Sequence, residues 1–346
     1  MNQAELAGSS DAGGDAQLTA GLARWLTARL GCSHVTVTEL TRPTSGYSSE
    51  TIFIDARWDQ GGSLCEESLV LRMAPRGRGS FADYDLVPQF EAQMAANAVG
   101  VPIADPTLET DPDWVGAPFI LMPRVNGRVI GQLPHLDPWV ASLSGRERQL
   151  LYDEFLRTLV AIHGAHTDKI PHVPRRDNGA ELDYWQEYLS WSCNGHPVPA
   201  LVEALTWCRW HRPDQEPPAT PLWGDVRFEN CVIGDDGRIL AVLDWDMASV
   251  GAPEHDLAWL TSLDFTMRHL VGHRVDGFPD RNGTVARFEE LSGRPMIDFE
   301  WYETFAMVRS TAIMTRLNFL RQEVGKPVLL PLEQNPILDL LATRLS

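Results

Sequence analysis

The most constraining feature of the sequence is a short stretch in which three oxygen-bearing side chains flank a tight turn. Residues 222–230 read LWGDVRFEN, and LDWD at 243–246 follows after the turn GDDG at 234–237. This turn predicts a β-hairpin with strands at 230–233 and 238–243. We expect Ile233 to face Arg238. Asn230 then lies opposite Ala241, within about three residue rises of Asp244.

Asp225 is only one short loop away from this hairpin, so two carboxylates and an amide oxygen should converge. Such hard oxygen ligands suit Mg²⁺ when the ion also holds substrate phosphates. The pattern D-x-x-x-x-N followed by a strand-borne Asp is typical of phosphoryl transfer, which needs positioning and charge neutralisation more than covalent chemistry. Taken singly, Asp225 could belong to a turn, Asn230 to a strand cap and Asp244 to a solvated strand end. The combined spacing favours a site.

Length and charge limit the classes of protein to consider. The 346 residues, 44% of them hydrophobic, are enough for two lobes with a sizeable core. There are 29 Lys and Arg against 47 Asp and Glu, a formal net charge of −18 at pH 7. This balance argues against a nucleic-acid partner or an anionic-membrane partner, because both need a basic patch.

The cysteines and the apolar segments bear on location. The five cysteines are odd in number, far apart and without a C-x-x-C pair, which indicates free thiols in a reducing compartment. We find no signal-peptide pattern at residues 1–16 and no apolar run of the length a membrane span needs. The sequence therefore predicts a cytoplasmic protein.

The pattern of apolar residues predicts an α+β chain. Residues 1–16 are expected to form a mobile tail and 17–123 a first lobe, with helices at 18–30 and 85–98 and strands at 35–40, 51–58, 68–73 and 119–122 in an antiparallel sheet. A Pro, Asn and Gly cluster at 123–127 marks the lobe boundary. The second lobe, 124–346, should be mainly helical, with helices at 145–163, 180–193, 198–210, 256–270, 285–291 and 299–321.

These motifs, in this order, resemble the aminoglycoside phosphotransferases and their relatives, such as the choline and fructosamine kinases. The resemblance spans about 36–321 and is strongest over 222–260, where the family typically shows H-G-D-x-x-x-x-N, a hairpin, I-D-W and G-x-P-x-x-D-L-A. It implies a two-lobe protein-kinase-like fold and transfer of a phosphoryl group from ATP or GTP to a small-molecule hydroxyl. By this likeness Asp225 would be the catalytic base and Asn230 and Asp244 would hold Mg²⁺. Asp256 would brace the catalytic loop.

In the first lobe the resemblance implies two nucleotide-binding elements. The segment containing Ser45, Gly46 and Ser48 resembles the phosphate-covering turn, although any hairpin could carry such residues. The strand at 68–73 resembles the one that carries a phosphate-contacting cation, here Arg72, on the same face as Val70.

The resemblance also implies a partner for this cation and a contact for the base. Glu91, on the following helix, fits the acidic residue that would hold Arg72, and an ordinary surface ion pair is the alternative. Residues 120–124, with Met122 among them, resemble the hinge whose backbone meets the adenine edge.

Two positions depart from the family pattern. Trp223 stands where the family usually has a His, so the side chain donates only through its indole N–H. Ala252 stands where an Asp is frequent. Trp223 motivates an alternative function, a nucleotide-binding sensor or interaction protein without catalytic activity. A metal-dependent hydrolase is a third reading.

The acceptor side is less determined. Aromatic residues gather before the catalytic loop at Trp185, Tyr188, Trp191, Trp207 and Trp210, with Glu187, Asp214 and Glu216 among them. Such walls would suit an amine-bearing, hydroxylated acceptor, and a Trp-rich helical core is the alternative. His163 and His166, three residues apart, lack a nearby carboxylate or Cys ligand in the sequence, which argues against zinc. The identity of the acceptor and the oligomeric state stay open.

Overall fold

The chain forms two compact units. The computed structural model describes residues 12–42, 49–75, 77–131, 134–193, 198–272 and 274–345. Unit 1 comprises Met1–Gly79, Asp83–Phe90 and Ala104–Val125; unit 2 comprises Ser80–Ala82, Glu91–Ile103 and Asn126–Ser346. Within the described ranges, no helix combines the length and the apolar character that crossing a membrane requires.

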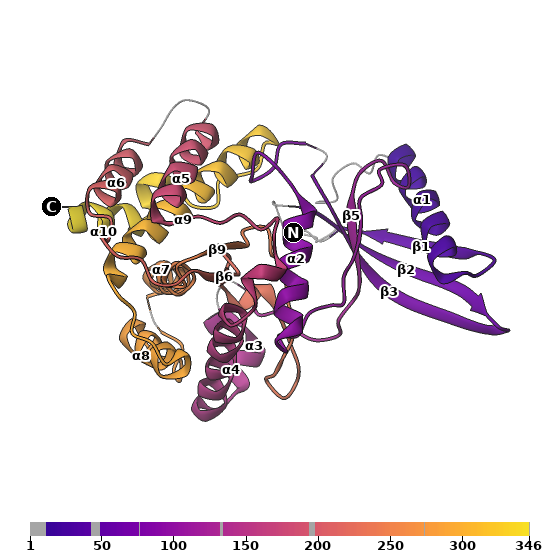
Figure 1. Ribbon diagram of the computed structural model, residues 1–346, viewed down its shortest axis with the longest axis horizontal. Coiled ribbons are helices and arrows are strands. Elements are labelled where there is room, and N and C mark those ends of the chain that lie inside the picture. Colours follow the sequence, from indigo (N-terminus) through magenta and orange to yellow (C-terminus); the bar gives the residue numbers. More distant parts are fainter. Residues whose placement is uncertain are drawn as a thin grey trace. The chain divides into compact units, whose positions relative to one another are not determined.

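Unit 1 is a five-stranded antiparallel sheet accompanied by one long helix (Figure 1). The strand order is β1-β2-β3-β5-β4, so β1 pairs with β2 and β2 with β3, whereas β3 pairs with β5 rather than with β4. The elements are α1 (Ala12–Leu30), β1 (Val35–Thr41), β2 (Glu50–Gln60), β3 (Ser63–Met73), β4 (Thr107–Glu109) and β5 (Phe119–Pro123), together with the beginning of α2 (Leu86–Ala98).

The two faces of this sheet differ because side chains alternate along each strand. One face carries buried apolar residues, such as Ile54 and Leu71, which form a core with Leu22 and Trp25 of α1. The ring of Trp25 meets that of Phe119 edge-on at 5.2 Å. The helix therefore covers one face of the sheet.

The opposite face of the sheet carries Arg72 and Met122, two of the residues that the sequence assigns to nucleotide binding. Val70 pairs with Met122 and Arg72 pairs with Ile120 in the β3–β5 register, so all four point to the same side. The predicted common face of Val70 and Arg72 is therefore present.

Two elements of unit 1 are longer than their apolar patterns indicate. Helix α1 begins at Ala12 rather than Leu18, so residues 12–16 are helical and are not part of a tail. Asp15, in its first turn, forms an ion pair with Arg42 at 2.6 Å, a tertiary contact that periodicity does not report. Strand β3 begins at Ser63 because the ladder with β2 continues through its polar residues.

Unit 2 is mainly helical and contains two small two-stranded sheets, β6-β9 and β7-β8. The six helices that the sequence predicts here are all present, and the elements that it misses are the shortest strands and turns and the helices α3 and α10. The elements are α3 (Pro138–Ser142), α4 (Gly145–His163), α5 (Asn178–Ser192), α6 (Pro199–Trp210), β6 (Thr220–Leu222), β7 (Cys231–Ile233), β8 (Ile239–Val242), β9 (Ser249–Gly251), α7 (Glu254–Val271), α8 (Arg281–Ser292), α9 (Phe299–Glu323) and α10 (Pro336–Leu345), with short 3₁₀ turns at Pro134–Leu136, Thr167–Lys169, Phe228–Asn230 and Leu332–Gln334.

Helix α4 shows how local sequence sets a boundary in this unit. The Ser144 hydroxyl accepts from the backbone N–H of Glu147, whose carboxylate accepts in turn from the Ser144 N–H, a complete capping box. Gly164 follows the last helical residue and donates its N–H to the carbonyl oxygens of the final turn. Both ends of α4 are therefore readable from the sequence.

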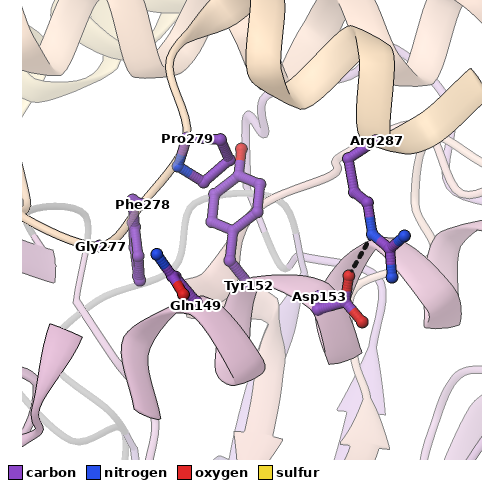
Figure 2. Close-up of a pocket in the computed structure, with 7 residues that line it drawn as sticks. All are labelled: Gln149, Tyr152, Asp153, Gly277, Phe278, Pro279 and Arg287. Carbon is purple, nitrogen blue, oxygen red and sulfur yellow. Dashed lines mark hydrogen bonds and ion pairs between the residues drawn. The ribbon is translucent and has the colours of Figure 1, made fainter. Parts of the chain in front are cut away.

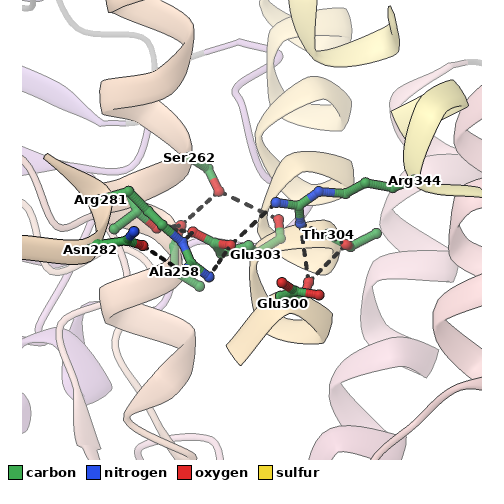
Figure 3. A network of polar contacts seen from close by, with 9 residues as sticks. Ala258, Ser262, Arg281, Asn282, Glu300, Glu303, Thr304 and Arg344 are labelled. Atoms are coloured by element: carbon green, nitrogen blue, oxygen red, sulfur yellow. Dashed lines mark hydrogen bonds and ion pairs between the residues drawn. The ribbon is translucent and has the colours of Figure 1, made fainter. Parts of the chain in front are cut away.

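A buried carboxylate on α9 joins four helices of unit 2 (Figure 3). Glu303, 3% exposed, accepts two hydrogen bonds from Arg281 of α8, at 3.0 and 2.8 Å. Arg344 of α10 lies 3.3 Å from the same carboxylate, and the Thr261 hydroxyl of α7 donates to it at 3.0 Å. The charge of Glu303 is therefore compensated from three sides.

We expect Glu303→Ala to lower the free energy of unfolding by about 2–3 kcal/mol, because it leaves two guanidinium groups and a hydroxyl without their acceptor. Glu300→Ala, on the exposed side of the same helix, is the matched control and should change stability by less than about 0.5 kcal/mol. Urea unfolding followed by circular dichroism measures both. Equal effects of the two substitutions would contradict the role given to Glu303.

Candidate active site

The β7–β8 hairpin brings Asn230 beside the segment that carries Asp244. The backbone N–H of Leu243 donates to the carbonyl oxygen of Asn230 at 2.8 Å. The predicted pairing of Ile233 with Arg238 is wrong by one residue: Ile233 pairs with Ile239, and the register shifts between Val232 and Ile233. This irregularity moves Asn230 closer to Asp244 than the regular hairpin would.

Asp225 is buried and held by three donors. The indole N–H of Trp259 donates to its Oδ1 at 2.9 Å, and the side-chain amide of Asn230 donates to its Oδ2 at 2.8 Å. The guanidinium of Arg227 lies 2.8 Å from the same Oδ2. The carboxylate is therefore fixed in one orientation, as a group that must meet a reacting hydroxyl requires.

The electrostatic surroundings of Asp225 make it a stronger base than an exposed aspartate. Burial, with the side chain only 8% exposed, raises the pKa of Asp225, while the charge of Arg227 lowers this pKa and the nearby Asp244 raises it. The net direction is upward. A carboxylate with a raised pKa accepts a proton more readily.

Asn230 and Asp244 present ligands of the kind that Mg²⁺ takes. The amide nitrogen of Asn230 faces Asp225, donating to its carboxylate and to its carbonyl oxygen, so the amide oxygen lies on the other side of the group. Asp244 is close enough to affect the pKa of Asp225. One carboxylate with one amide oxygen fits an ion that takes its remaining ligands from phosphate and water. No group of three or more His, Cys, Asp or Glu side chains within the described residues could hold a metal ion.

Asp256, predicted to brace the catalytic loop, makes the contacts of a brace. Its two oxygens accept the backbone N–H groups of Trp223 and Gly224, each at 2.9 Å. His163 Nε2 lies 2.9 Å from Oδ2 of the same carboxylate. The loop is thereby tied to the first turn of α7 and to the end of α4.

Trp223, the departure from the family's His, is 1% exposed, and its indole faces the segment that carries Asp244. Its indole N–H lies 2.9 Å from the carbonyl oxygen of Leu243 and 3.2 Å from that of Asp244. The ring packs against Phe155 and Trp245. A bulky ring at this position therefore still links the catalytic loop to the segment of Asp244.

Gly224 lies where only glycine fits. Its φ of +89° falls in the left-handed region, and a Cβ atom there would lie 2.3 Å from the backbone oxygen of Met247. This close approach brings the catalytic loop against the turn that follows Asp244. Glycine at this position is a requirement of the site's geometry.

Arg227 and Trp259 are functional candidates that sequence reasoning misses. Arg227 bridges Asp225 and Glu229, with its Nη1 3.3 Å from the Glu229 carboxylate. Trp259 lies three residues after Asp256, so the same face of α7 supplies the brace and a donor to Asp225. Two features of the sequence could have identified them: Arg227 stands two positions after Asp225, and Trp259 directly follows the motif D-L-A at 256–258.

Only some of the predicted nucleotide-binding residues lie in the part of the chain that the structure describes. Ser45, Gly46 and Ser48 lie outside the described residues. Arg72 donates to the hydroxyl of Ser49 at 2.8 Å.

Glu91 belongs to unit 2, where its carboxylate accepts from the backbone N–H and ring nitrogen of His172. The pairing of Arg72 with Glu91 stays a prediction.

The aromatic group before the catalytic loop is partly core: Trp210 is exposed, whereas Trp185 is buried and its indole N–H donates to the carboxylate of Glu181 at 2.9 Å. Trp185 and Tyr188 are buried, whereas Glu187 is exposed. From α9, the guanidinium of Arg309 lies 5.8 Å from the Trp185 ring and that of Arg316 lies 4.1 Å from the Trp191 ring. The acidic residues expected among these rings, Glu187, Asp214 and Glu216, are exposed. The burial of Trp185 and Tyr188 favours the alternative of a Trp-rich core.

Arg309 connects this core to the catalytic centre. It is 4% exposed, lies 3.5 Å from Glu181 and places its guanidinium 5.3 Å from the ring of Trp259. Its Nη2 donates to the carbonyl oxygen of His255. Burial and the charge of Arg309 lower the pKa of His255 to about 3, so this histidine is neutral.

A pocket of about 330 Å³ is lined by residues of α4, α8 and the segment 277–279 (Figure 2). Tyr152 and Phe278 line it, and both rings contact Phe228 of the loop, at 5.7 and 5.4 Å between centroids. Pocket and catalytic loop thus share an aromatic wall. The lining residues are Gln149, Tyr152, Asp153, Gly277, Phe278, Pro279 and Arg287.

A family model supports the reading of this site. The model of the phosphotransferase enzyme family matches residues 39–291, which is most of the chain. The chain belongs to the phosphotransferase enzyme family. The resemblance stated from the motifs is therefore confirmed, and the site of this phosphotransferase lies inside the matched region.

Solved structures of other phosphotransferases share the fold. A Ralstonia eutropha protein provisionally described as an aminoglycoside phosphotransferase aligns with a TM-score of 0.68 and 22% identity, covering 94% of this chain and 97% of that one. Macrolide 2'-phosphotransferase type I aligns with a TM-score of 0.56 and 17% identity, covering 99% of this chain and 98% of that one. The predicted α+β, two-lobe, protein-kinase-like fold is confirmed.

The curated relatives are longer proteins that are named as members of the acyl-CoA dehydrogenase family rather than as phosphotransferases. The chain is 27% identical over 268 residues to Acyl-CoA dehydrogenase family member 11 of Rattus norvegicus, covering 75% of this chain and 32% of that protein. It is 26% identical over 317 residues to Acyl-CoA dehydrogenase family member 10 of Mus musculus, covering 85% and 27%. The phosphotransferase chain thus spans about a third or less of these relatives.

We expect Gly224→Ala to destabilise this phosphotransferase by about 2–4 kcal/mol, the sum of left-handed strain and overlap with the Met247 backbone. Gly237→Ala is the control, because Gly237 also has a left-handed φ, +79°, but nothing lies within 4 Å of the added Cβ. It should cost only the strain, about 1–2 kcal/mol. Equal losses in thermal or urea unfolding would show that the approach to Met247 is unimportant.

Proposed function

We propose that this phosphotransferase transfers the γ-phosphoryl group of ATP or GTP to a hydroxyl group of a small molecule. The observation that carries the proposal is the convergence of Asp225, Asn230 and Asp244, with the Asp225 carboxylate fixed by three donors. This arrangement supplies a base and a pair of metal ligands side by side. It is what phosphoryl transfer between oxygens needs.

The roles follow from the contacts. Asp225 would orient the acceptor hydroxyl and accept its proton, helped by the raised pKa that burial causes. Asn230 and Asp244 would hold Mg²⁺, which when bound neutralises charge on the phosphates. Arg227, beside Asp225, would add positive charge toward the transferred group. For Arg72, on one sheet face of unit 1, we propose the contact with the nucleotide phosphates that the family resemblance implies.

The donor nucleotide and the acceptor are matters for direct measurement. Aminoglycoside 2'-phosphotransferase-IIIa, a structural neighbour with a TM-score of 0.52, was solved as a GDP complex, which supports including GTP beside ATP. The name of the longer relatives supports adding hydroxylated acyl thioesters to a panel of aminoglycosides, sugars and amino alcohols. The burial of Trp185 and Tyr188 weakens the case for an amine-bearing acceptor held by these two rings.

The alternative, a nucleotide-binding protein without catalytic activity, was motivated by Trp223. The contacts of its indole with the segment of Asp244 weaken that motive, because the ring braces the site instead of disturbing it. We also propose a cytoplasmic location, supported by five free cysteines.

We expect Asp225→Asn to lower the acceptor-stimulated release of ADP or GDP by about 10²–10⁴-fold, because the amide cannot take the hydroxyl proton. Nucleotide binding should change little, whereas the melting temperature should fall, because the amide loses the ion pair with Arg227 and turns an NH₂ group toward a donor. Activity is therefore compared at a temperature at which both proteins are folded. Asp236→Asn, the same substitution on the exposed hairpin turn, is the control and should retain full activity.

The measurement is coupled detection of ADP or GDP across the acceptor panel with Mg²⁺. If Mg-ATP and Mg-GTP bind but no acceptor stimulates turnover, and Asp225→Asn behaves like the parent protein, the silent sensor replaces the kinase. If neither nucleotide binds, both proposals fail.

A further inference from the structure

Asp244 has an unusual backbone conformation for a residue that is not glycine. Its φ is +57°, in the left-handed region. Holding a side-chain-bearing residue there costs about 1–2 kcal/mol, so some other interaction must keep the segment in this conformation. The direction of the Asp244 carboxylate depends on it, because a return to an extended φ would rotate the side chain to another side of the chain.

The indole of Trp223 is placed to supply that interaction. One N–H lies 2.9 Å from the carbonyl oxygen just before Asp244 and 3.2 Å from the carbonyl oxygen of Asp244 itself. The acceptors are thus the two backbone carbonyls on either side of the left-handed φ and ψ angles. A buried hydrogen bond contributes about 0.5–1.5 kcal/mol, more when the alternative is an unsatisfied group, which is comparable with the strain.

Trp223 is itself immobile. Its backbone N–H is bound by the carboxylate of Asp256, its side chain is 1% exposed, and its ring contacts Phe155 of α4. The position of its N–H is therefore set by the catalytic loop and the helical core, and it does not follow Asp244. A hydrogen-bond donor held in this way can keep the neighbouring backbone of Asp244 in its strained conformation.

We propose that Trp223 is a positioning residue that holds Asp244 in the conformation required for metal binding through its indole N–H rather than through the bulk of its ring. This proposal rests on the proposed function, since it assumes that Asp244 binds Mg²⁺ together with a nucleotide. It assigns a role in metal affinity to a residue that touches neither metal nor nucleotide.

Two substitutions of Trp223 can distinguish the effect of its N–H donor from the effect of its ring volume. A histidine carries Nε2 at the same position of a five-membered ring as the indole Nε1, so Trp223→His can keep a donor while removing the benzo ring. Trp223→Phe keeps more apolar ring but has no donor. Loss of packing should make the His variant the less stable of the two, because it leaves a larger cavity and a second buried ring nitrogen.

The experiment measures the binding of ADP, or of GDP where ADP does not bind, with and without Mg²⁺ by isothermal titration calorimetry. It uses the parent protein, Trp223→Phe, Trp223→His and Asp244→Ala. The readout is the ratio of the Kd in EDTA to the Kd in excess Mg²⁺. Loss of an outer-shell contact costs about 10–100-fold in metal affinity. We expect Trp223→Phe to lower the ratio by about 10-fold with an unchanged Kd in EDTA, and Trp223→His to stay within about 3-fold of the parent ratio.

Melting temperatures recorded on the same samples make the outcomes decisive. The proposal is supported if the ratio follows the donor while the melting temperature follows ring volume. It is overturned if both variants lower the ratio in proportion to their loss of stability, or if Trp223→Phe leaves the ratio unchanged. If Trp223→Phe does not fold, Trp223→His alone decides: a parent-like ratio supports the proposal and a lowered ratio overturns it.

The controls distinguish this inference from the function on which it rests. A Mg²⁺ effect that is present in the parent, lost in Asp244→Ala and intact in Trp223→Phe refutes only the role of Trp223. No Mg²⁺ effect in the parent protein refutes the metal site itself, and no ADP or GDP binding refutes the phosphotransferase proposal.

Discussion

The carboxylate of Asp256 is the interaction on which the rest of the site depends. It sits in the first turn of α7, buried, and accepts two consecutive backbone N–H groups of the catalytic loop while contacting His163 at the end of α4. Without it, the N–H groups of Trp223 and Gly224 would be buried without acceptors, a cost of about 1–3 kcal/mol each. One side chain thus connects two helices to the loop that carries Asp225.

The same stretch of α7 contributes a second contact that fixes the reacting group. Trp259, one turn after Asp256, donates to Asp225, and its ring rests against the guanidinium of Arg309 from α9. Helix periodicity makes this possible, since residues three apart share a face. The buried charge of Arg309 is in turn compensated by Glu181 of α5. The position of Asp225 is therefore determined by packing among helices far apart in the sequence.

The sequence predicts which side chains lie together in the candidate site better than it predicts the contacts that support them. Asp225, Asn230 and Asp244 stand out because a hairpin forces their spacing together, and the helices follow from their apolar period. The exact register failed because a bulge between Val232 and Ile233 depends on tertiary context.

The contacts of other residues were not predictable for a different reason. Arg309 reads as a surface residue in a helical pattern, and only the packed structure shows that it lies buried against Trp259. Likewise, nothing in the letters around Trp223 indicates which carbonyl oxygens its indole reaches. Propensity and periodicity describe neighbours in the chain, whereas these contacts join segments of 20 residues' separation or more.

The left-handed backbone of Asp244 has a consequence for how this chain can change over generations. Glycine would occupy that conformation without strain, so replacing Asp244 by Gly would relieve about 1–2 kcal/mol at the position while deleting a proposed metal ligand. Selection for stability alone therefore favours losing the carboxylate. In a copy of this gene released from the proposed catalytic function, loss of this carboxylate would therefore meet little opposition from stability.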